Sequence, residues 1–93
     1  SLPVEPAPGG PDVAQIRIQL PDGKKLNRCF VKGNTVETVR NYLEVYFGNS
    51  ASEITNFAVS TSYPMRSLDD MHETLESAGL FPRGMLMVRD LDA

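Results

Sequence analysis

The chain has 93 residues and a mass of 10.2 kDa, so it can form one domain at most. Its net charge of −3 at pH 7 argues against a domain that binds nucleic acid by neutralising phosphates, because such domains are strongly basic. No apolar run approaches the ~20 residues of a membrane-spanning helix. A single cysteine excludes an internal disulfide and a cysteine zinc site, and it favours a reducing compartment, the cytoplasm or the nucleus.

Residues 1–12 have the composition of a flexible linker. They contain four prolines and the pair Gly9-Gly10, and they have too little apolar surface to pack. They also lack the basic and apolar stretches of a signal peptide. Because the chain does not begin with Met, we expect a module of a longer protein, with its folded domain over residues 13–93.

A β-hairpin is expected next. Apolar and polar residues alternate over 14–20, which is typical of a half-buried strand. Residues 21–24 read Pro-Asp-Gly-Lys and predict a turn, and a second strand follows over 26–31. Arg28 falls on the inward face of that strand. We expect its aliphatic stem to cover the edge of the core while its guanidinium reaches solvent.

A helix is expected over residues 36–47, where the apolar residues recur on one stripe at helical spacing. Asn34 or Thr35 would cap its start, and Glu37 stands where a capping box places its acidic residue. Gly48 would end the helix.

The rest of the chain predicts three strands and one short helical turn. Residues 56–62 alternate as a strand does, and a turn at 63–66 leads into a short strand that carries Leu68. Residues 74–80 begin with Thr and have Gly near their end, as one turn of helix would. Residues 85–88 are apolar on both faces, which indicates a central strand.

Four segments carry a resemblance to a known family: Ile-Arg-Ile-Gln-Leu-Pro-Asp-Gly at 16–23, Leu-x-Arg-x-Phe at 26–30, Ser-Tyr-Pro at 62–64 and Thr-Leu-Glu-Ser-Ala-Gly-Leu at 74–80. Their order and spacing resemble the UBX domain, a ubiquitin-regulatory module of adaptors of the hexameric AAA ATPase called valosin-containing protein. The resemblance implies an α+β fold of the ubiquitin-like β-grasp type, in which a mixed five-stranded sheet wraps around one main helix.

The resemblance also implies a function and a site. Such a module would dock its adaptor onto the N-terminal domain of the ATPase in ubiquitin-dependent protein handling. Independently of the resemblance, we expect a monomeric domain, because one core accounts for most of the apolar residues. UBX domains that dock typically carry an Arg on the first strand and Phe-Pro-Arg between strands three and four. Gln19 aligns with that first-strand Arg, and Arg17 lies two residues earlier on the same outward face, ~7 Å away. The implied partner-binding residues are Arg17, Gln19, Tyr63, Pro64, Met65 and Arg66.

Two other readings of the residues bear on function. Phe81-Pro82-Arg83 spells the family tripeptide letter for letter, and we interpret it as structural, with Phe81 packing and Pro82 shaping a turn. No combination of residues indicates catalysis, a cofactor or a metal, because Cys29 and His72 stand alone in the sequence. We therefore expect no enzyme, no cofactor and no binding to nucleic acid or membrane. The alternative function is a ubiquitin-like interaction domain that has lost ATPase docking and binds another partner, such as a small GTPase.

Overall fold

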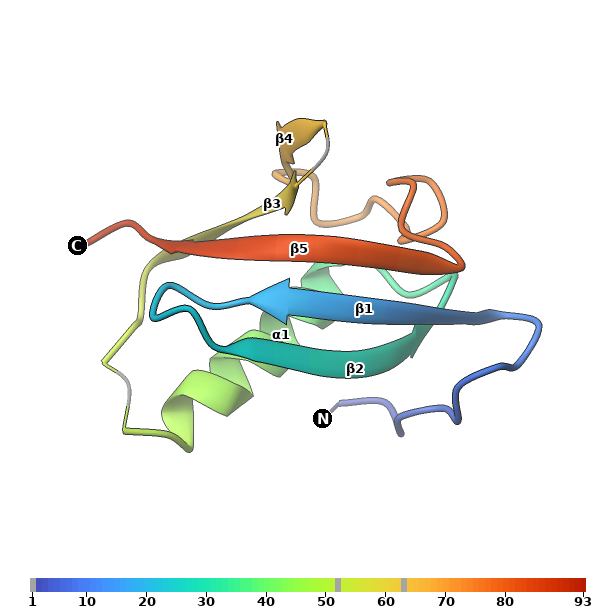
Figure 1. Ribbon diagram of the computed structural model, residues 1–93, viewed down its shortest axis with the longest axis horizontal. Coiled ribbons are helices and arrows are strands. Elements are labelled where there is room, and N and C mark those ends of the chain that lie inside the picture. Colours follow the sequence, from blue (N-terminus) through green and yellow to red (C-terminus); the bar gives the residue numbers. More distant parts are fainter. Residues whose placement is uncertain (1, 52, 63) are drawn as a thin grey trace.

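Five strands and one helix make up the fold that the computed structural model describes for residues 2–51, 53–62 and 64–93. In chain order they are β1 (Val13–Gln19), β2 (Lys25–Val31), α1 (Val36–Gly48), β3 (Phe57–Ser62), β4 (Met65–Ser67) and β5 (Arg83–Asp90). The strands form a mixed sheet in the order β2-β1-β5-β3-β4, in which β1 and β5 are parallel (Figure 1). The expected α+β class and β-grasp arrangement are thereby confirmed. Within the described part, no helix is long and apolar enough to cross a membrane.

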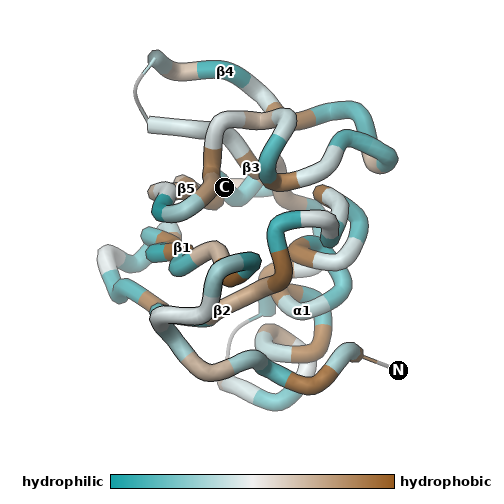
Figure 2. Tube along the Cα trace, turned by 90° about the vertical axis from the view of Figure 1, so that its right-hand side faces the viewer, coloured by the Kyte–Doolittle hydropathy of each residue, from teal (hydrophilic) through white to brown (hydrophobic). Residues whose placement is uncertain are grey.

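The core lies between α1 and one face of the sheet (Figure 2). The stripe predicted on the helix is buried, and Leu43 has no exposed surface. The strands contribute the alternate residues that the period of two predicts. Their buried apolar side chains are Ala14, Ile16, Ile18, Phe30, Phe57, Val59, Leu86 and Val88.

The start of α1 is held differently from the prediction. The N-cap residue makes no side-chain hydrogen bond, and Asn34 Oδ1 accepts instead from the main-chain N–H of the last residue of β2. The N–H groups of Val36 and Glu37 donate to the main-chain oxygens of Glu73 (2.9 Å) and Met71 (3.1 Å). The predicted capping box is therefore wrong, because a loop more than 30 residues later in the chain supplies the acceptors that the first helical turn needs.

Both glycines predicted to end helical segments lie at such ends, but only Gly79 has the positive φ of a glycine that follows a helical turn. Gly79 has a φ of +81° at the end of a single hydrogen-bonded turn, in which the Ala78 N–H donates to the Thr74 carbonyl at 2.9 Å. Gly48 is the last residue of α1 itself and has no positive φ. Asn49 follows as the C-cap residue, and its own N–H bonds back to the carbonyls of the last turn.

The N-terminal residues, expected to form a linker, lie alongside β2 (Figure 1). Arg28 Nη2 donates to the Pro3 carbonyl at 3.0 Å, and the Cys29 N–H donates to Glu5 Oε2 at 2.9 Å. Arg28 is buried, at 9% exposure, with its guanidinium carbon 4.7 Å from the centre of the Phe30 ring. The expectation that this guanidinium reaches solvent is thus wrong, because the N-terminal residues supply it with a hydrogen-bond acceptor. Composition alone did not indicate these contacts, and the flexibility of residues 1–12 stays a prediction.

Candidate partner-binding surface

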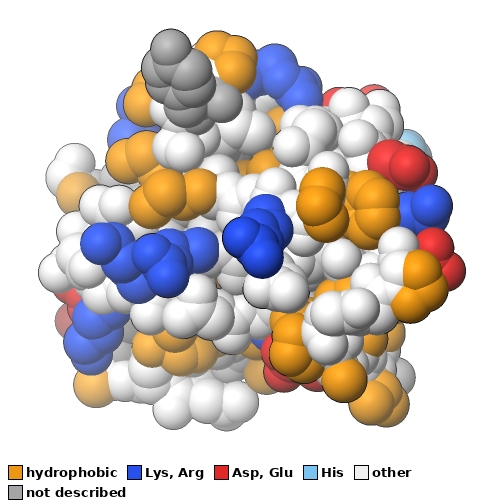
Figure 3. Space-filling model, turned by 45° about the vertical axis from the view of Figure 1, so that its right-hand side comes forward, with side chains coloured by type: hydrophobic (Ala, Val, Ile, Leu, Met, Phe, Trp, Pro, Cys, Tyr) orange, Lys and Arg blue, Asp and Glu red, His pale blue; other side chains and the backbone are white. Residues whose placement is uncertain are grey.

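The sheet face that points away from α1, here called the outer sheet face, is basic although the whole chain is acidic. Its positions are 13, 15, 17 and 19 on β1, 25–31 on β2 (odd numbers), 83–89 on β5 (odd numbers), 58, 60 and 62 on β3, and 65 and 67 on β4. These described positions include four cations, Arg17, Lys25, Arg83 and Arg89, and no carboxylate. Figure 3 shows Lys and Arg side chains on this side of the molecule among hydrophobic ones.

The turn between β3 and β4 presents an exposed apolar side chain on this face. Met65 is 71% exposed, and its register opposite Ser62 places it on the outer sheet face. The neighbouring Pro64 is also exposed, and its carbonyl accepts a hydrogen bond from the buried hydroxyl of Thr61 at 2.6 Å. This bond holds the end of the turn to the core. Tyr63, which the sequence places in the same site, lies outside the described residues.

Arg66 points to the opposite side of the sheet from Met65. Its register opposite the buried Thr61 gives it the inward direction. There its guanidinium reaches the carboxylate of Glu73, with Nη2 3.2 Å from Oε2 and Nη1 3.4 Å from Oε1. The structure therefore gives Arg66 a partner within the chain and separates it from the outer sheet face.

The two residues predicted on the first strand lie farther from the turn than expected. To form one site with the 63–66 turn, Arg17 and Gln19 need the first strand to lie beside that turn, but β5 lies between β1 and β3. Strands are spaced ~4.8 Å apart, so β1 is two strand spacings from β3. Arg17 lies opposite Met85 of β5, and its Nε donates to Asn27 Oδ1 at 3.3 Å. The juxtaposition that we expected is therefore wrong for Arg17.

Gln19 and Met65 nevertheless line one hollow, on either side of β5. The hollow has a volume of about 360 Å³, and Met87 and Arg89 of the intervening strand also line it. The hollow combines two flexible methionine side chains, a neutral amide and a cation. Methionine adapts its shape to irregular apolar partners, so this arrangement suits a protein surface better than a small polar ligand.

Arg83 belongs to the same region, which the sequence did not indicate. It shares one hollow, of about 330 Å³, with Pro64 and Arg66, and a second, of about 640 Å³, with Arg17. Arg83 is on β5 and thus lies between Arg17 on β1 and the β3–β4 turn. The position of Arg83 follows from the strand register, which places it opposite Gln15, and no local sequence motif predicts it.

The other two residues of the Phe-Pro-Arg tripeptide are structural, as predicted. Phe81 packs against the core, and Lys32 Nζ lies 5.2 Å from the centre of its ring. The Phe81–Pro82 bond is cis, and the Pro82 carbonyl accepts the Gln15 N–H at 2.9 Å. No three His, Cys, Asp or Glu side chains among the described residues are grouped as metal ligands would be.

Comparisons with known proteins agree with this fold and with the resemblance. FAS-associated factor 2-A of Xenopus laevis is 31% identical over 97% of this chain, and UBX domain-containing protein 1-B of the same species is 34% identical over 95%. The chain spans only 21% and 31% of the lengths of these two relatives.

Solved structures show the same fold. The UBX domain of the D0H8S2298E protein superposes with a TM-score of 0.79 at 24% identity, covering 97% of this chain and 80% of that one. A designed protein based on ubiquitin superposes with a TM-score of 0.67 at 23% identity, covering 90% of this chain and 95% of that one. The family model described as "UBX domain" matches residues 9–90. The chain therefore belongs to the UBX domain family and is a protein-interaction module.

Proposed function

We propose that this module docks its parent adaptor onto the N-terminal domain of a hexameric AAA ATPase of the valosin-containing protein type, in ubiquitin-dependent protein handling in the cytoplasm or nucleus. The observation that carries the proposal is the exposed pair Pro64 and Met65, presented beside the cationic outer sheet face of a UBX domain. The module acts as a monomer, because its large apolar side chains are mostly buried in one core.

The end of the β3–β4 turn suits an apolar groove of a partner. Proline restricts the main chain, and the Thr61 hydroxyl holds the Pro64 carbonyl, so little conformational entropy is lost when the turn binds. Met65 then supplies apolar surface that is removed from water when the partner binds. Tyr63 is expected to add the aromatic anchor that such interfaces favour.

The charge of the outer sheet face indicates an acidic partner surface. Arg17, Arg83 and Arg89 are exposed, and no carboxylate at the outward positions of the described strands opposes them. Complementary charge of this kind raises the rate of association and orients the encounter. We propose Arg17 and Gln19 as secondary contacts and Arg66 as a contact that must exchange Glu73 for a partner carboxylate.

A titration of the isotope-labelled chain with the isolated N-terminal domain of the ATPase tests the proposal. We expect amide shifts in residues 58–67 and 83–89, with weaker shifts at 17–19. Tyr63→Ala should weaken binding by at least ~2 kcal/mol, as expected for a buried aromatic anchor. Met65→Ala should also weaken it, whereas Val45→Ala, which removes an exposed apolar side chain from α1, should not.

Two results would count against the proposal. The first is an absence of amide shifts at high micromolar ATPase domain. The second is binding with shifts confined to α1. A parallel titration with a small GTPase in its triphosphate-bound state tests the alternative function. Amide shifts at Arg17 with the GTPase, and none with the ATPase domain, would favour that alternative.

A further inference from the structure

The free edge of β2 is closed by the chain's own N-terminal residues 3–8, here called the N-terminal strap. Among the described residues, β2 is the outermost strand of the sheet and pairs only with β1. An unpaired edge presents main-chain groups that can recruit another chain. In this protein the strap lies along that edge in both views of the fold (Figures 1 and 2).

The side chain that receives the strap is positioned by β2 and α1, not by the strap. Arg28 Nη1 donates to the Cys29 carbonyl at 2.6 Å. Its guanidinium carbon lies 4.7 Å from the centre of the Phe30 ring and 5.3 Å from that of Tyr42 on α1. These contacts leave Nη2 to donate to the Pro3 carbonyl. Arg28 is therefore a pre-oriented cation on the edge that can donate a hydrogen bond to a main-chain carbonyl of an extended segment.

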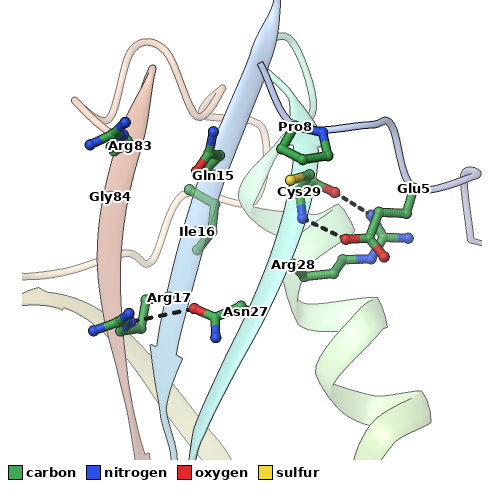
Figure 4. A pocket seen from close by; sticks show the side chains of 10 residues that line it. All are labelled: Glu5, Pro8, Gln15, Ile16, Arg17, Asn27, Arg28, Cys29, Arg83 and Gly84. Atoms are coloured by element: carbon green, nitrogen blue, oxygen red, sulfur yellow. Dashed lines mark hydrogen bonds between the residues drawn. The ribbon is translucent and has the colours of Figure 1, made fainter. Parts of the chain in front are cut away.

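A second contact recognises a carboxylate. The Cys29 N–H points away from β1 and donates to Glu5 Oε2 at 2.9 Å (Figure 4). Cys29 occupies an outward position on β2 yet is only 9% exposed, and it lines a hollow together with Glu5 and Pro8. The strap thus covers a main-chain donor and a thiol that the strand order would otherwise leave open to solvent.

The strap does not extend the sheet as a sixth strand. Its prolines, Pro3, Pro6 and Pro8, have no N–H to donate to a strand ladder, and they favour an extended main chain. Recognition consequently depends on one carbonyl and one carboxylate two residues apart. Gly9, with a φ of +90°, lets the chain reverse between the strap and β1, and Asp12 O accepts the Lys32 N–H at 2.8 Å beyond the reversal.

We propose that the β2 edge with Arg28 is a peptide-docking site for extended, proline-containing segments that carry a carboxylate, and that the strap occupies it in cis as an internal ligand. A partner segment of the same chemistry would bind only by displacing the strap. The site lies at the opposite edge of the sheet from the β3–β4 turn, although Arg17 and Arg83 of the proposed ATPase-docking surface line the same hollow as Glu5 and Cys29.

The experiment uses the full 93-residue chain with Glu5→Ala, and Glu44→Ala as the matched control, which removes an exposed carboxylate from α1. Glu5→Ala should shift the Cys29 amide resonance and speed both its hydrogen exchange and the reaction of the Cys29 thiol by about three- to tenfold, the range that loss of one hydrogen bond gives. Glu44→Ala should leave all three unchanged. An unchanged Cys29 in Glu5→Ala would overturn the cis occupancy.

A synthetic peptide of residues 2–8 tests the site in trans. It should bind the Glu5→Ala chain at least about threefold more tightly than the unchanged chain, because the weakened strap competes less. It should also return the Cys29 amide toward its original position. The same peptide with Gln in place of its Glu should bind several-fold more weakly. Equal or no binding of the peptide to both chains would overturn the docking site.

Sedimentation of the same samples separates a second copy from the internal strap. A monomer at all concentrations supports occupancy in cis. A concentration-dependent dimer that dissociates with Glu5→Ala would overturn it, because the strap of one copy would then be docking on another.

Discussion

Arg66 and Glu73 form a two-point ion pair that ties β4 to the loop before the 74–80 turn. Both guanidinium nitrogens reach the carboxylate, at 3.4 and 3.2 Å, and the Glu73 side chain is only 17% exposed. The main-chain carbonyl of the same Glu73 accepts a hydrogen bond from the first N–H of α1, at 2.9 Å. One loop residue therefore holds both the short edge strand and the start of the helix.

A double-mutant cycle of Arg66→Ala and Glu73→Ala should show a coupling free energy of about 0.5–1 kcal/mol in chemical unfolding. The half-exposed guanidinium limits the gain, so the coupling should shrink in 1 M salt, where screening is strong. The matched control is Lys24 and Asp22, whose atoms are 3.9 Å apart and whose side chains are 72% and 57% exposed. That pair should show almost no coupling. Equal coupling in the two pairs would contradict the argument.

Gly84→Ala should destabilise the domain by about 1–3 kcal/mol, as overpacking does. The loop residue Leu80 lies against the main chain of β5 at this point, and a Cβ on Gly84 would come within 2.9 Å of the Leu80 Cβ and 3.0 Å of its Cα. Gly33→Ala is the control, because a Cβ there meets open space and its φ is not positive. It should leave the unfolding midpoint unchanged or raise it slightly. Similar losses in both variants would refute the close approach at Gly84.

The sequence predicted most elements of this fold well because local periodicity sets them. The exception is β4 (Met65–Ser67), which begins inside the predicted 63–66 turn and ends before Leu68. Phe57, Val59 and Thr61 alternate on β3 and are all buried, and Leu43 sits on the buried stripe of α1. What failed depends on contacts between distant parts of the chain. Thr35 is the N-cap residue, as predicted, but the acceptors for the first N–H groups of the helix come from residues 71 and 73, which no helix-capping pattern near residue 35 can reveal.

The candidate site shows the same limit. Parity correctly places Arg17 and Gln19 on an outward face, but it does not say that β5 lies between them and the β3–β4 turn. Arg28 was recognised as structural, yet its partners are on the strap and on α1. Each of these neighbours is fixed by strand order or by chain reversal, and neither has a short sequence signature.

Tyr42 should titrate at a higher pH than an ordinary tyrosine. Burial raises the pKa of its hydroxyl above 10.0, and nearby Arg28 opposes part of this rise. The folded state thus favours the neutral phenol, so its contribution to stability is complete below pH 10 and is lost as the pH rises through the folded pKa. Near-ultraviolet absorbance of the unchanged chain minus that of Tyr42→Phe should show this late titration. In Tyr42→Phe, the free energy of unfolding should fall less steeply as the pH rises above 10. A Tyr42 titration at or below pH 10 would contradict the raised pKa.

Arg83 is expected to contribute to ATPase docking, although the sequence alone gave it no binding role. It is exposed on the outer sheet face, and it borders both the hollow that contains Pro64 and the hollow that contains Arg17. A cation in that position is well placed to meet an acidic rim of the partner.

Arg83→Ala should therefore weaken binding by about 0.5–1 kcal/mol, mainly through slower association, and the loss should diminish at high salt. Lys24→Ala is the control, since it removes an exposed cation from the β1–β2 turn, away from both hollows. Surface-immobilised ATPase domain gives the association and dissociation rates directly. If Arg83→Ala binds like the unchanged chain while Met65→Ala does not, contact is confined to the end of the β3–β4 turn and the basic face takes no part in it.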